Sequence, residues 1–230
     1  MGVAVVASGL MQVVNASFVR LVAQPSWLPM RPVLAVASGV VLVVVGVALM
    51  LDRQRRPAAL VWGGLLGIAL LLRLPEIAAN PGAGFVWTNP AKIGALIGGA
   101  LLLASPAPRA VAWAAGLLAV FLCLGGVQHF VYAGFVDTLV PAWIPPGQRF
   151  WTCATGGALV AGGIGLLIPA TRWWAAVLSG VMIFLWVVLL HVPRSVEMKN
   201  AFELAGVFEA LAVAGICWLM AGKAGARAGS

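Results

Sequence analysis

The sequence predicts an all-α integral membrane protein with about eight transmembrane helices, arranged as two parallel four-helix repeats. Composition is the first reason: of 230 residues, 63% are hydrophobic and 9% are charged, and the mean hydropathy is +1.06. Such a chain cannot bury its apolar surface in a core of its own, and its apolar runs are long enough to span lipid. Backbone groups in hydrocarbon must pair within their own segment, which favours helices. None of the runs alternates polar and apolar residues, as the strands of a membrane barrel would.

The charge and the cysteines exclude two other classes of protein. The net charge is +8, but the 14 basic residues lie mostly in short loops, where they set topology and meet lipid phosphates. No soluble basic face with interleaved aromatic residues is present, so nucleic acid is not an expected partner. Cys123, Cys153 and Cys217 form no C-x-x-C motif and are interpreted as small apolar helix residues.

Four apolar segments are predicted as spans in the first half, at residues 3–19, 33–51, 58–72 and 91–104. The first is interrupted by Gln12 and Asn15 and lacks the basic leader and cleavage site of a signal peptide, so it is interpreted as a retained helix. The third and fourth are short, and each has glycines four residues apart, which favours close helix packing. Loops at 20–32 and 73–90 and a charged turn at 52–57 connect them.

The second half repeats this plan, with spans predicted at residues 110–131, 152–168, 173–190 and 201–221. A long polar connection, Val127–Trp151, joins the first two of these, and a short polar loop leads from His191 to Asn200. Nine of the ten tryptophans fall near predicted helix ends, as an interfacial aromatic belt would. A short basic tail, 223–230, ends the sequence.

Ordered anchors indicate an internal duplication. Gln12 precedes Gln128 by 116 residues (128 − 12), and Trp27-Leu-Pro29 precedes Trp143-Ile-Pro145 by the same number (143 − 27). Arg73-Leu-Pro75 matches His191-Val-Pro193 at 118 (193 − 75), and Asn89 matches Asn200 at 111 (200 − 89). Four spans per unit make the repeats parallel. The alternative is coincidence among apolar runs of low complexity.

This duplication divides the chain into a degenerate repeat at 1–105, a better-kept repeat at 106–222 and the tail at 223–230. At these offsets, the counterparts of His129, His191, Glu203 and Glu209 are Val13, Arg73, Lys92 and Gly98. At these four positions, imidazole and carboxylate groups therefore occur in the second copy alone, and the sequence predicts that one half carries any site.

Alternating helix direction brings the polar groups of the second half to one face of the membrane. His129 ends the fifth span, Trp151 begins the sixth, His191 ends the seventh, and the eighth begins near Asn200. Glu209 lies six residues beyond Glu203, about 9 Å deeper in the eighth helix. Ionisable groups at that depth are costly and usually face a bundle interior or a cavity, so a functional interpretation is the default.

The candidate pocket residues share this face: His129, His191, Glu203, Glu209, Gln128, Arg149 and Trp151. The two histidines can hydrogen-bond backbone or water at the interface, hold a metal or haem, or line a pocket for a quinone, an anion or another small ligand. Glu203 can favour a helix N-terminus by its charge, and Arg149 can contact lipid phosphate. Glu209 can have a structural partner such as Gln128. No residue is assigned a catalytic role.

Sidedness is decided by the density of basic turns, because the basic residues divide seven against seven between the two faces. One face has the shorter, denser turns and Asp52 as its one acid, and we expect it to be cytoplasmic. Both termini would then be cytoplasmic and the His/Glu mouth extracytoplasmic. The expected location is the inner (plasma) membrane of a bacterium.

The residues that follow resemble a known family. They are Gly126-Val-Gln-His129-Phe130, Val140-Pro-Ala-Trp143-Ile-Pro145, Phe150-Trp151 with Thr155-Gly156, His191-Val-Pro193, and Asn200 with Glu203. Together this pattern, over about residues 110–221, resembles the DoxX-like family of small four-helix membrane proteins. The resemblance implies a four-helix fold and a neighbourhood of membrane redox systems, which in that family include the membrane subunit of a thiosulfate:quinone oxidoreductase. Residues 1–105 resemble the family through the duplication alone.

Three functional hypotheses follow. The first is a subunit of, or an accessory to, a membrane redox system, with His129, His191 and Glu209 in a pocket for a quinone or a small sulfur-containing ligand. Haem is the other cofactor considered, and other membrane redox subunits and the lipid bilayer are the expected partners. The second hypothesis is a non-catalytic assembly or stress-protection factor. The third is a small-solute transporter, although the sequence lacks the paired broken helices typical of that class.

Overall fold

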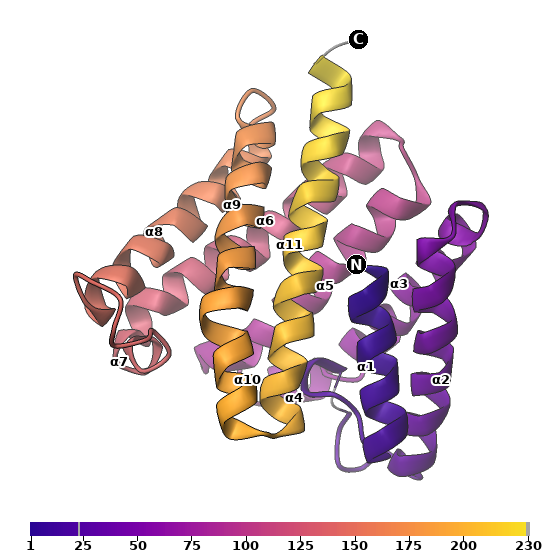
Figure 1. Ribbon diagram of the computed structural model, residues 1–230. Coiled ribbons are helices and arrows are strands. Elements are labelled where there is room, and N and C mark those ends of the chain that lie inside the picture. The colour runs from indigo at the N-terminus through magenta and orange to yellow at the C-terminus, as the bar shows by residue number, and fades with distance from the viewer. Residues whose placement is uncertain (23, 229–230) are drawn as a thin grey trace.

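A computed structural model describes residues 1–22 and 24–228 of the chain, which fold into helices with no strand among them. Figure 1 shows the long helices side by side in one bundle. In the first half they are α1 (Gly2–Asn15), α2 (Arg31–Met50), α3 (Arg55–Leu71) and α5 (Thr88–Ala104). In the second half they are α6 (Pro108–Val131), α8 (Gln148–Leu167), α9 (Arg172–Trp186) and α11 (Ala201–Ala228).

Short helices connect the long ones. They are η1 (Arg20–Val22), η2 (Asp52–Gln54), α4 (Leu74–Ala79), η3 (Gly84–Trp87), α7 (Ala133–Asp137), the π-helical turn η4 (Val187–His191) and α10 (Val192–Met198). In Figure 1, α4, α7 and α10 lie toward the lower end of the bundle, opposite the C-terminus. The polar connections of both halves therefore meet at one end, as alternating helix direction predicts.

Seven helical segments of the described chain are long and apolar enough to cross a membrane. The predicted class, an all-helical membrane protein, agrees with this. The predicted first span, 3–19, is shorter than expected: α1 has 14 residues, and Ala16 at its end takes a left-handed conformation with φ 45°. At 1.5 Å per residue, 14 residues reach about 21 Å, against about 30 Å of hydrocarbon.

Several other boundaries differ from the predicted ones. The predicted loop 73–90 contains α4 and η3, so that Arg55–Ala79 forms one helical segment of 25 residues. The helix α8 begins at Gln148, inside the predicted connection. The helix α11 continues to Ala228, so the predicted tail is helical over 223–228, and residues 229–230 lie outside the described part. Sequence periodicity defines helix interiors better than helix ends.

The long helices pack in the same way in both halves. In the first half α1 packs on α2, α2 on α3, and α3 on α5; in the second, α6 packs on α8, α8 on α9, and α9 on α11. Long helices also pack across the two halves: α5 with α6, α11 with α1, and α5 with α11. Each half thus places its last long helix against the first helix of the other.

Glycines bring the first two helices of each half into close contact. A Cβ added to Gly9 would lie 2.6 Å from the carbonyl oxygen of Gly39, and one added to Gly126 would lie 2.6 Å from that of Gly156. Small residues at such crossings let helix backbones approach one another, which is how helices associate in lipid.

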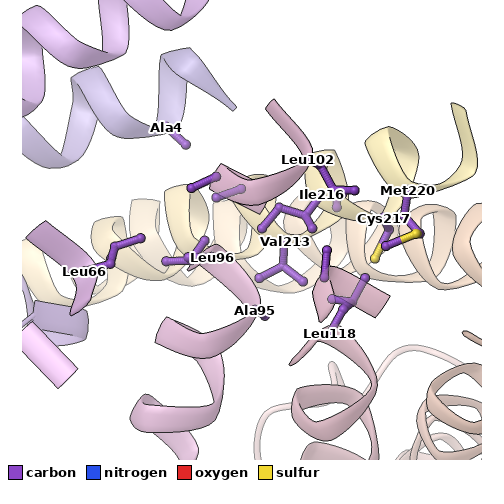
Figure 2. Packing of buried hydrophobic residues seen from close by; sticks show 14 of the residues in the cluster. Ala4, Leu66, Ala95, Leu96, Leu102, Leu118, Val213, Ile216, Cys217 and Met220 are labelled. Atoms are coloured by element: carbon purple, nitrogen blue, oxygen red, sulfur yellow. The ribbon is translucent and has the colours of Figure 1, made fainter. Parts of the chain in front are cut away.

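The core lies where α5, α6 and α11 meet, and Figure 2 shows part of it. Leu96, Leu118, Val213, Ile216 and Met220 are all buried there. The outer faces of the bundle carry exposed large apolar residues instead, among them Val14, Val44, Leu71, Trp113 and Leu178. In a chain with this hydropathy, such an outer surface suits contact with lipid.

Candidate functional site

A cavity of about 470 Å³ lies between α5, α6, η4 and α11, with residues of η1, η3, α7, α8 and α9 also in its wall. Its volume is in the range of small-molecule sites, about 300–1,000 Å³. The predicted pocket residues Gln128, His129, His191 and Glu209 line it. The wall therefore includes groups from both halves of the chain, because η1 and α5 belong to the first.

Glu209 anchors the polar side of the cavity. Its side chain is 5% exposed, and its two carboxylate oxygens accept hydrogen bonds from Arg20 Nε at 3.0 Å and Lys92 Nζ at 2.6 Å. Charges so deep in an apolar bundle are costly unless they are paired. The formal charges of this cluster, two positive and one negative, leave it with a net charge of +1. The cluster favours a ligand with hydrogen-bond acceptors or negative charge.

Arg20 is held in place from several directions. Its guanidinium carbon lies 4.5 Å from the centre of the Phe202 ring, a cation–π contact, while Arg73 donates a hydrogen bond to the Arg20 carbonyl at 3.3 Å. The helix η1 brings Arg20 back toward the bundle just after α1 ends. The early end of α1 is therefore what lets Arg20 reach Glu209.

Gly206, one turn before Glu209 on α11, makes room for these groups. A Cβ at this position would lie 2.8 Å from Arg20 Nη2 and 3.2 Å from His191 Nδ1. Arg20 and His191 thus both approach the backbone of α11 at Gly206. His191 stands at the end of the π-helical turn η4, which holds one more residue per turn than an α-helix.

One ring nitrogen of His129 is engaged in a hydrogen bond to the backbone. Its Nδ1 lies 2.7 Å from the carbonyl oxygen of Gly125, one helical turn earlier, and a carbonyl can only accept, so Nδ1 carries the proton. In the neutral ring Nε2 is then an acceptor. The ring also stacks on Trp186, with centroids 5.8 Å apart and planes inclined by 24°.

Gln128 fixes the start of α5 against α6. Its amide nitrogen donates to the carbonyl of Gly84 at 2.8 Å, and its amide oxygen accepts from the Thr88 hydroxyl at 3.0 Å. It does not pair with Glu209, the partner considered for it from the sequence. Its position in the cavity wall therefore comes with a structural role.

Most of the remaining wall is apolar, and several of its residues are aromatic. Phe85, Phe121, Phe135 and Trp186 line it, together with aliphatic residues of α8, α9 and α11. Phe85 is 68% exposed and Phe135 is 66% exposed, so both stand at the outer rim. The cavity combines a charged side with aromatic walls, which suits an amphiphilic ligand that has a flat ring.

Three predicted site residues lie outside the cavity wall. Glu203 pairs with Arg194 at 3.1 Å, and its backbone N–H is capped by Asn200 at 2.9 Å. Arg149 pairs with Asp137 at 2.9 Å. The Trp151 indole donates to the Pro145 carbonyl at 2.9 Å. These contacts fix the loops around α7 and α10 rather than form the cavity.

The two cations of the cavity wall, Arg20 and Lys92, were not predicted as site residues from the sequence. Both were assigned to the basic residues of one membrane face. A signal was present for Lys92, because it is the single ionisable residue inside the predicted span 91–104. A lone cation in an apolar helix predicts a buried acid on another helix.

A metal interpretation of the two histidines finds no cluster to support it. Among residues 1–22 and 24–228, no group of three or more His, Cys, Asp or Glu side chains is placed to hold a metal ion. The ring nitrogen of His129 that bonds Gly125 is also unavailable as a ligand in this arrangement.

A comparison with protein families gives a match to part of the chain. A family described as Domain of unknown function (DUF8561) matches residues 117–201. The matched segment contains His129 and His191 and ends before Glu209. No curated protein and no solved structure matches the chain.

Proposed function

We propose that this chain binds a quinone-type molecule in the cavity between its halves, as a subunit of, or an accessory to, a membrane redox system. The observation that carries the proposal is the pairing of a cationic polar side with aromatic walls in one cavity of about 470 Å³. The proposal concerns binding and makes no claim of turnover.

The polar groups of the cavity complement a quinone or its reduced form. Arg20 and Lys92 are donors that can reach an acceptor oxygen on the ligand, beside the carboxylate they already contact. The free Nε2 of a neutral His129 can accept a hydrogen bond from a quinol hydroxyl. A ligand with an acceptor at one end of a ring and a hydroxyl at the other uses both kinds of group.

The apolar groups suit the ring and the tail. Trp186, already stacked on His129, offers a flat aromatic surface, and stacked aromatic pairs contribute about 0.5–1.5 kcal/mol beyond their buried area. The exposed Phe85 and Phe135 at the rim give an apolar route for a tail that continues into lipid.

Fluorescence quenching tests the proposal, because quinones quench tryptophan and Trp186 lines the cavity. The purified protein in lipid nanodiscs is titrated with a short-chain ubiquinone. We expect saturable quenching, loss of most of its amplitude in Trp186→Phe, and at least tenfold weaker binding in His191→Ala. Trp174→Phe, at a 61% exposed site, is the matched control and should keep the signal. Non-saturable quenching that Trp186→Phe leaves unchanged would refute the proposal.

A structural role is the second candidate, and the Glu209 cluster favours it. Glu209 on α11 ties together Arg20 and Lys92 of the first half, so the same ion pairs can serve assembly alone. In that case His191→Ala and Glu209→Gln should both lower thermal stability, and neither should change quinone quenching in the protein that remains folded.

We further propose that the chain consists of two parallel four-helix repeats, in which α1 is the short counterpart of α6. Glycine contacts support this. Gly126 and Gly156 follow Gly9 and Gly39 by 117 residues (126 − 9 and 156 − 39), and each pair makes the same close approach. A third approach, Gly46 against Val6, recurs as Gly163 against Cys123 at the same offset (163 − 46 and 123 − 6).

The loops account for departures from this offset. The Leu28 N–H bonds the Pro25 carbonyl, and the Ile144 N–H bonds the Pro141 carbonyl, at an offset of 116 (144 − 28). Gly147, just before α8, is one additional residue in the second loop, so from there on the offset is again 117 residues. The π-helical turn η4 adds one residue, since a π-turn is one residue wider than an α-turn, and so supports the offset of 118 at Pro193.

The register that we propose differs from the one suggested by the sequence. The Cβ atoms of Gln12 and His129 lie against Gly39 and Gly156 respectively, so Gln12 corresponds to His129 rather than to Gln128. In the last helices, Gly99 approaches Ile216, again 117 residues apart (216 − 99). The same offset pairs Lys92 with Glu209 (209 − 92), in place of the Asn89 and Asn200 alignment at 111.

For orientation in the membrane, we propose that the end with the α2–α3, α5–α6 and α8–α9 turns is cytoplasmic. It carries the dense basic turns, and the C-terminus lies at this end in Figure 1. Labelling of single cysteines placed in the α8–α9 turn with a membrane-impermeant reagent checks it; reaction in intact cells would contradict it.

A further inference from the structure

A second cavity lies within the first half of the chain, between α1, α2 and α3, with a volume of about 240 Å³. We propose that it is a second ligand site, which takes a neutral, membrane-soluble molecule with a hydroxyl group on an apolar chain. This goes beyond the quinone proposal, because it concerns a different cavity and a different class of ligand.

Two polar groups in its wall lack partners. Gln12 is fully buried; its amide oxygen accepts from the Ser38 hydroxyl at 3.0 Å, while its Nε2 has no partner among the described residues. Gln24 donates from Nε2 to the Val22 carbonyl at 2.7 Å, and its Oε1 is likewise unpartnered within the described chain. Both glutamines line the cavity. A buried amide without a partner is unfavourable, so such groups normally have one.

The unpartnered atoms are one donor and one acceptor. A hydroxyl group can satisfy both kinds, since it accepts at its oxygen and donates its proton. Apart from Ser38, whose hydroxyl is bonded to Gln12, the rest of the wall is apolar, and none of the residues in it is ionisable. A charged ligand would be left without a counter-ion there, which favours a neutral one.

The two cavities occupy matching places in the proposed repeats. At the offset of 117, residues of the second cavity correspond to residues of the first in five pairs: Gln12 and His129, Phe18 and Phe135, Leu42 and Leu159, Leu66 and Ile183, Ala69 and Trp186. The smaller cavity has a neutral amide where the larger has an imidazole, and Ala69 where the larger has its stacking tryptophan. It therefore keeps the place of a binding site but has no surface for a flat ring.

The rim of the second cavity faces the outside of the bundle. Leu34 and Ile68, both in its wall, are 39% and 56% exposed. In a membrane these apolar residues would meet hydrocarbon, so a membrane-soluble ligand can enter sideways from the lipid.

Photolabelling tests the proposal. Vesicles that contain the full chain are loaded with a long-chain alcohol bearing a diazirine, or with the matching hydrocarbon that lacks the hydroxyl, and adducts are located by mass spectrometry. We expect the alcohol to label cavity residues of α1, α2 and α3 at least fivefold more than the hydrocarbon does. Gln12→Leu should reduce this labelling at least fivefold, and so should Ala69→Trp, which fills the cavity.

Two exposed residues provide controls on the same helices, Asn15→Leu on α1 and Leu71→Trp on α3, and both should label as the wild type does. Thermal unfolding of each variant establishes that it is folded. Gln12→Leu nearly preserves the side-chain volume, so it still tests the proposal if Ala69→Trp does not fold. Equal labelling by alcohol and hydrocarbon, or wild-type labelling in Gln12→Leu, would overturn the proposal. Because quinone quenching reports on Trp186 in the other cavity, the two proposals can fail separately.

Discussion

Glu209 shows how one carboxylate can balance two cations inside an apolar bundle. With Arg20 and Lys92 both within hydrogen-bond distance, its removal leaves two positive charges facing each other. Breaking a buried pair by removing one partner typically costs about 3–5 kcal/mol, because the remaining charge is left unpaired. The cost should therefore depend on the charge left behind more than on the lost contacts.

Glu209→Gln is predicted to lower the free energy of unfolding by about 3–5 kcal/mol. The double variant Lys92→Met/Glu209→Gln restores the formal charge of +1 and should recover a large part of that loss. Thermal unfolding in one detergent measures both. A double variant no more stable than Glu209→Gln would contradict the charge-balance argument.

A substitution at Gly206 can distinguish effects on stability from effects on ligand binding. In a helix interior, alanine is favoured over glycine by about 1 kcal/mol, but a Cβ here would displace Arg20 and His191. We expect Gly206→Ala to change the melting temperature little and to weaken quinone binding at least tenfold. Gly222→Ala, on the same helix with no atom near its Cβ, is the control. Unchanged binding in Gly206→Ala would show that these two side chains do not contact the ligand.

At this scale the sequence predicted the depth of Glu209 but not its partners. Helix rise alone places its carboxylate deep in the last span, and burial there requires compensation. Arg20 reaches it because α1 ends early and η1 turns back, which depends on a left-handed Ala16 that no periodicity reveals. Glu203 has the same chemistry but pairs locally with Arg194.

At the scale of helices, two neighbouring glycines on α8 differ in what surrounds them. A Cβ at Gly156 would lie 2.8 Å from the Cβ of His129 and 3.2 Å from the Gly126 carbonyl oxygen, whereas nothing lies within 4 Å of one at Gly157. The first position sits at the crossing of α8 and α6, and the second does not.

Gly156→Ala is predicted to destabilise the protein by about 1–3 kcal/mol, because the crowded backbones must separate. Gly157→Ala should be neutral or stabilise by up to about 1 kcal/mol through helix propensity. Denaturant unfolding of the two variants side by side measures the difference. Equal effects would mean that the α6–α8 crossing is looser than the structure indicates.

Helix interiors were predicted well and helix ends poorly, for a physical reason. Long apolar runs such as 33–51 and 110–131 identify their helices by length and composition alone. Connections such as 73–90 fold into α4 and η3 through local turns and contacts that hydropathy does not encode. The π-helical turn η4 likewise adds a residue inside an uninterrupted apolar run.

On the scale of the whole molecule, each half packs its last long helix against the first long helix of the other half. The α5–α6 and α11–α1 contacts cross between them, and the link between α5 and α6 is short. Neither half is therefore complete alone: without the first half, Glu209 has neither Arg20 nor Lys92.

Residues 1–105 and 106–230, expressed together as two chains, are predicted to copurify, because the packed helices hold the halves together without the link. Residues 106–230 expressed alone should be aggregated or degraded. Affinity purification through a tag on one half measures this. If residues 106–230 alone were stable in detergent and bound quinone, the proposal of a cavity shared by the two halves would be contradicted.

The contact between Lys92 and Glu209 has a consequence for how such a chain can arise. In the proposed repeats these are equivalent positions, 117 residues apart, and they meet between the two central helices α5 and α11. In a symmetric homodimer of one four-helix unit, this position would face its own copy, lysine against lysine or glutamate against glutamate, and like charges would repel. A chain that joins two such units would be free of that restriction, because each unit could then take the opposite charge. If the proposed repeats are correct, the two units of the joined chain are unlike partners, and two identical units could not form their ion pair.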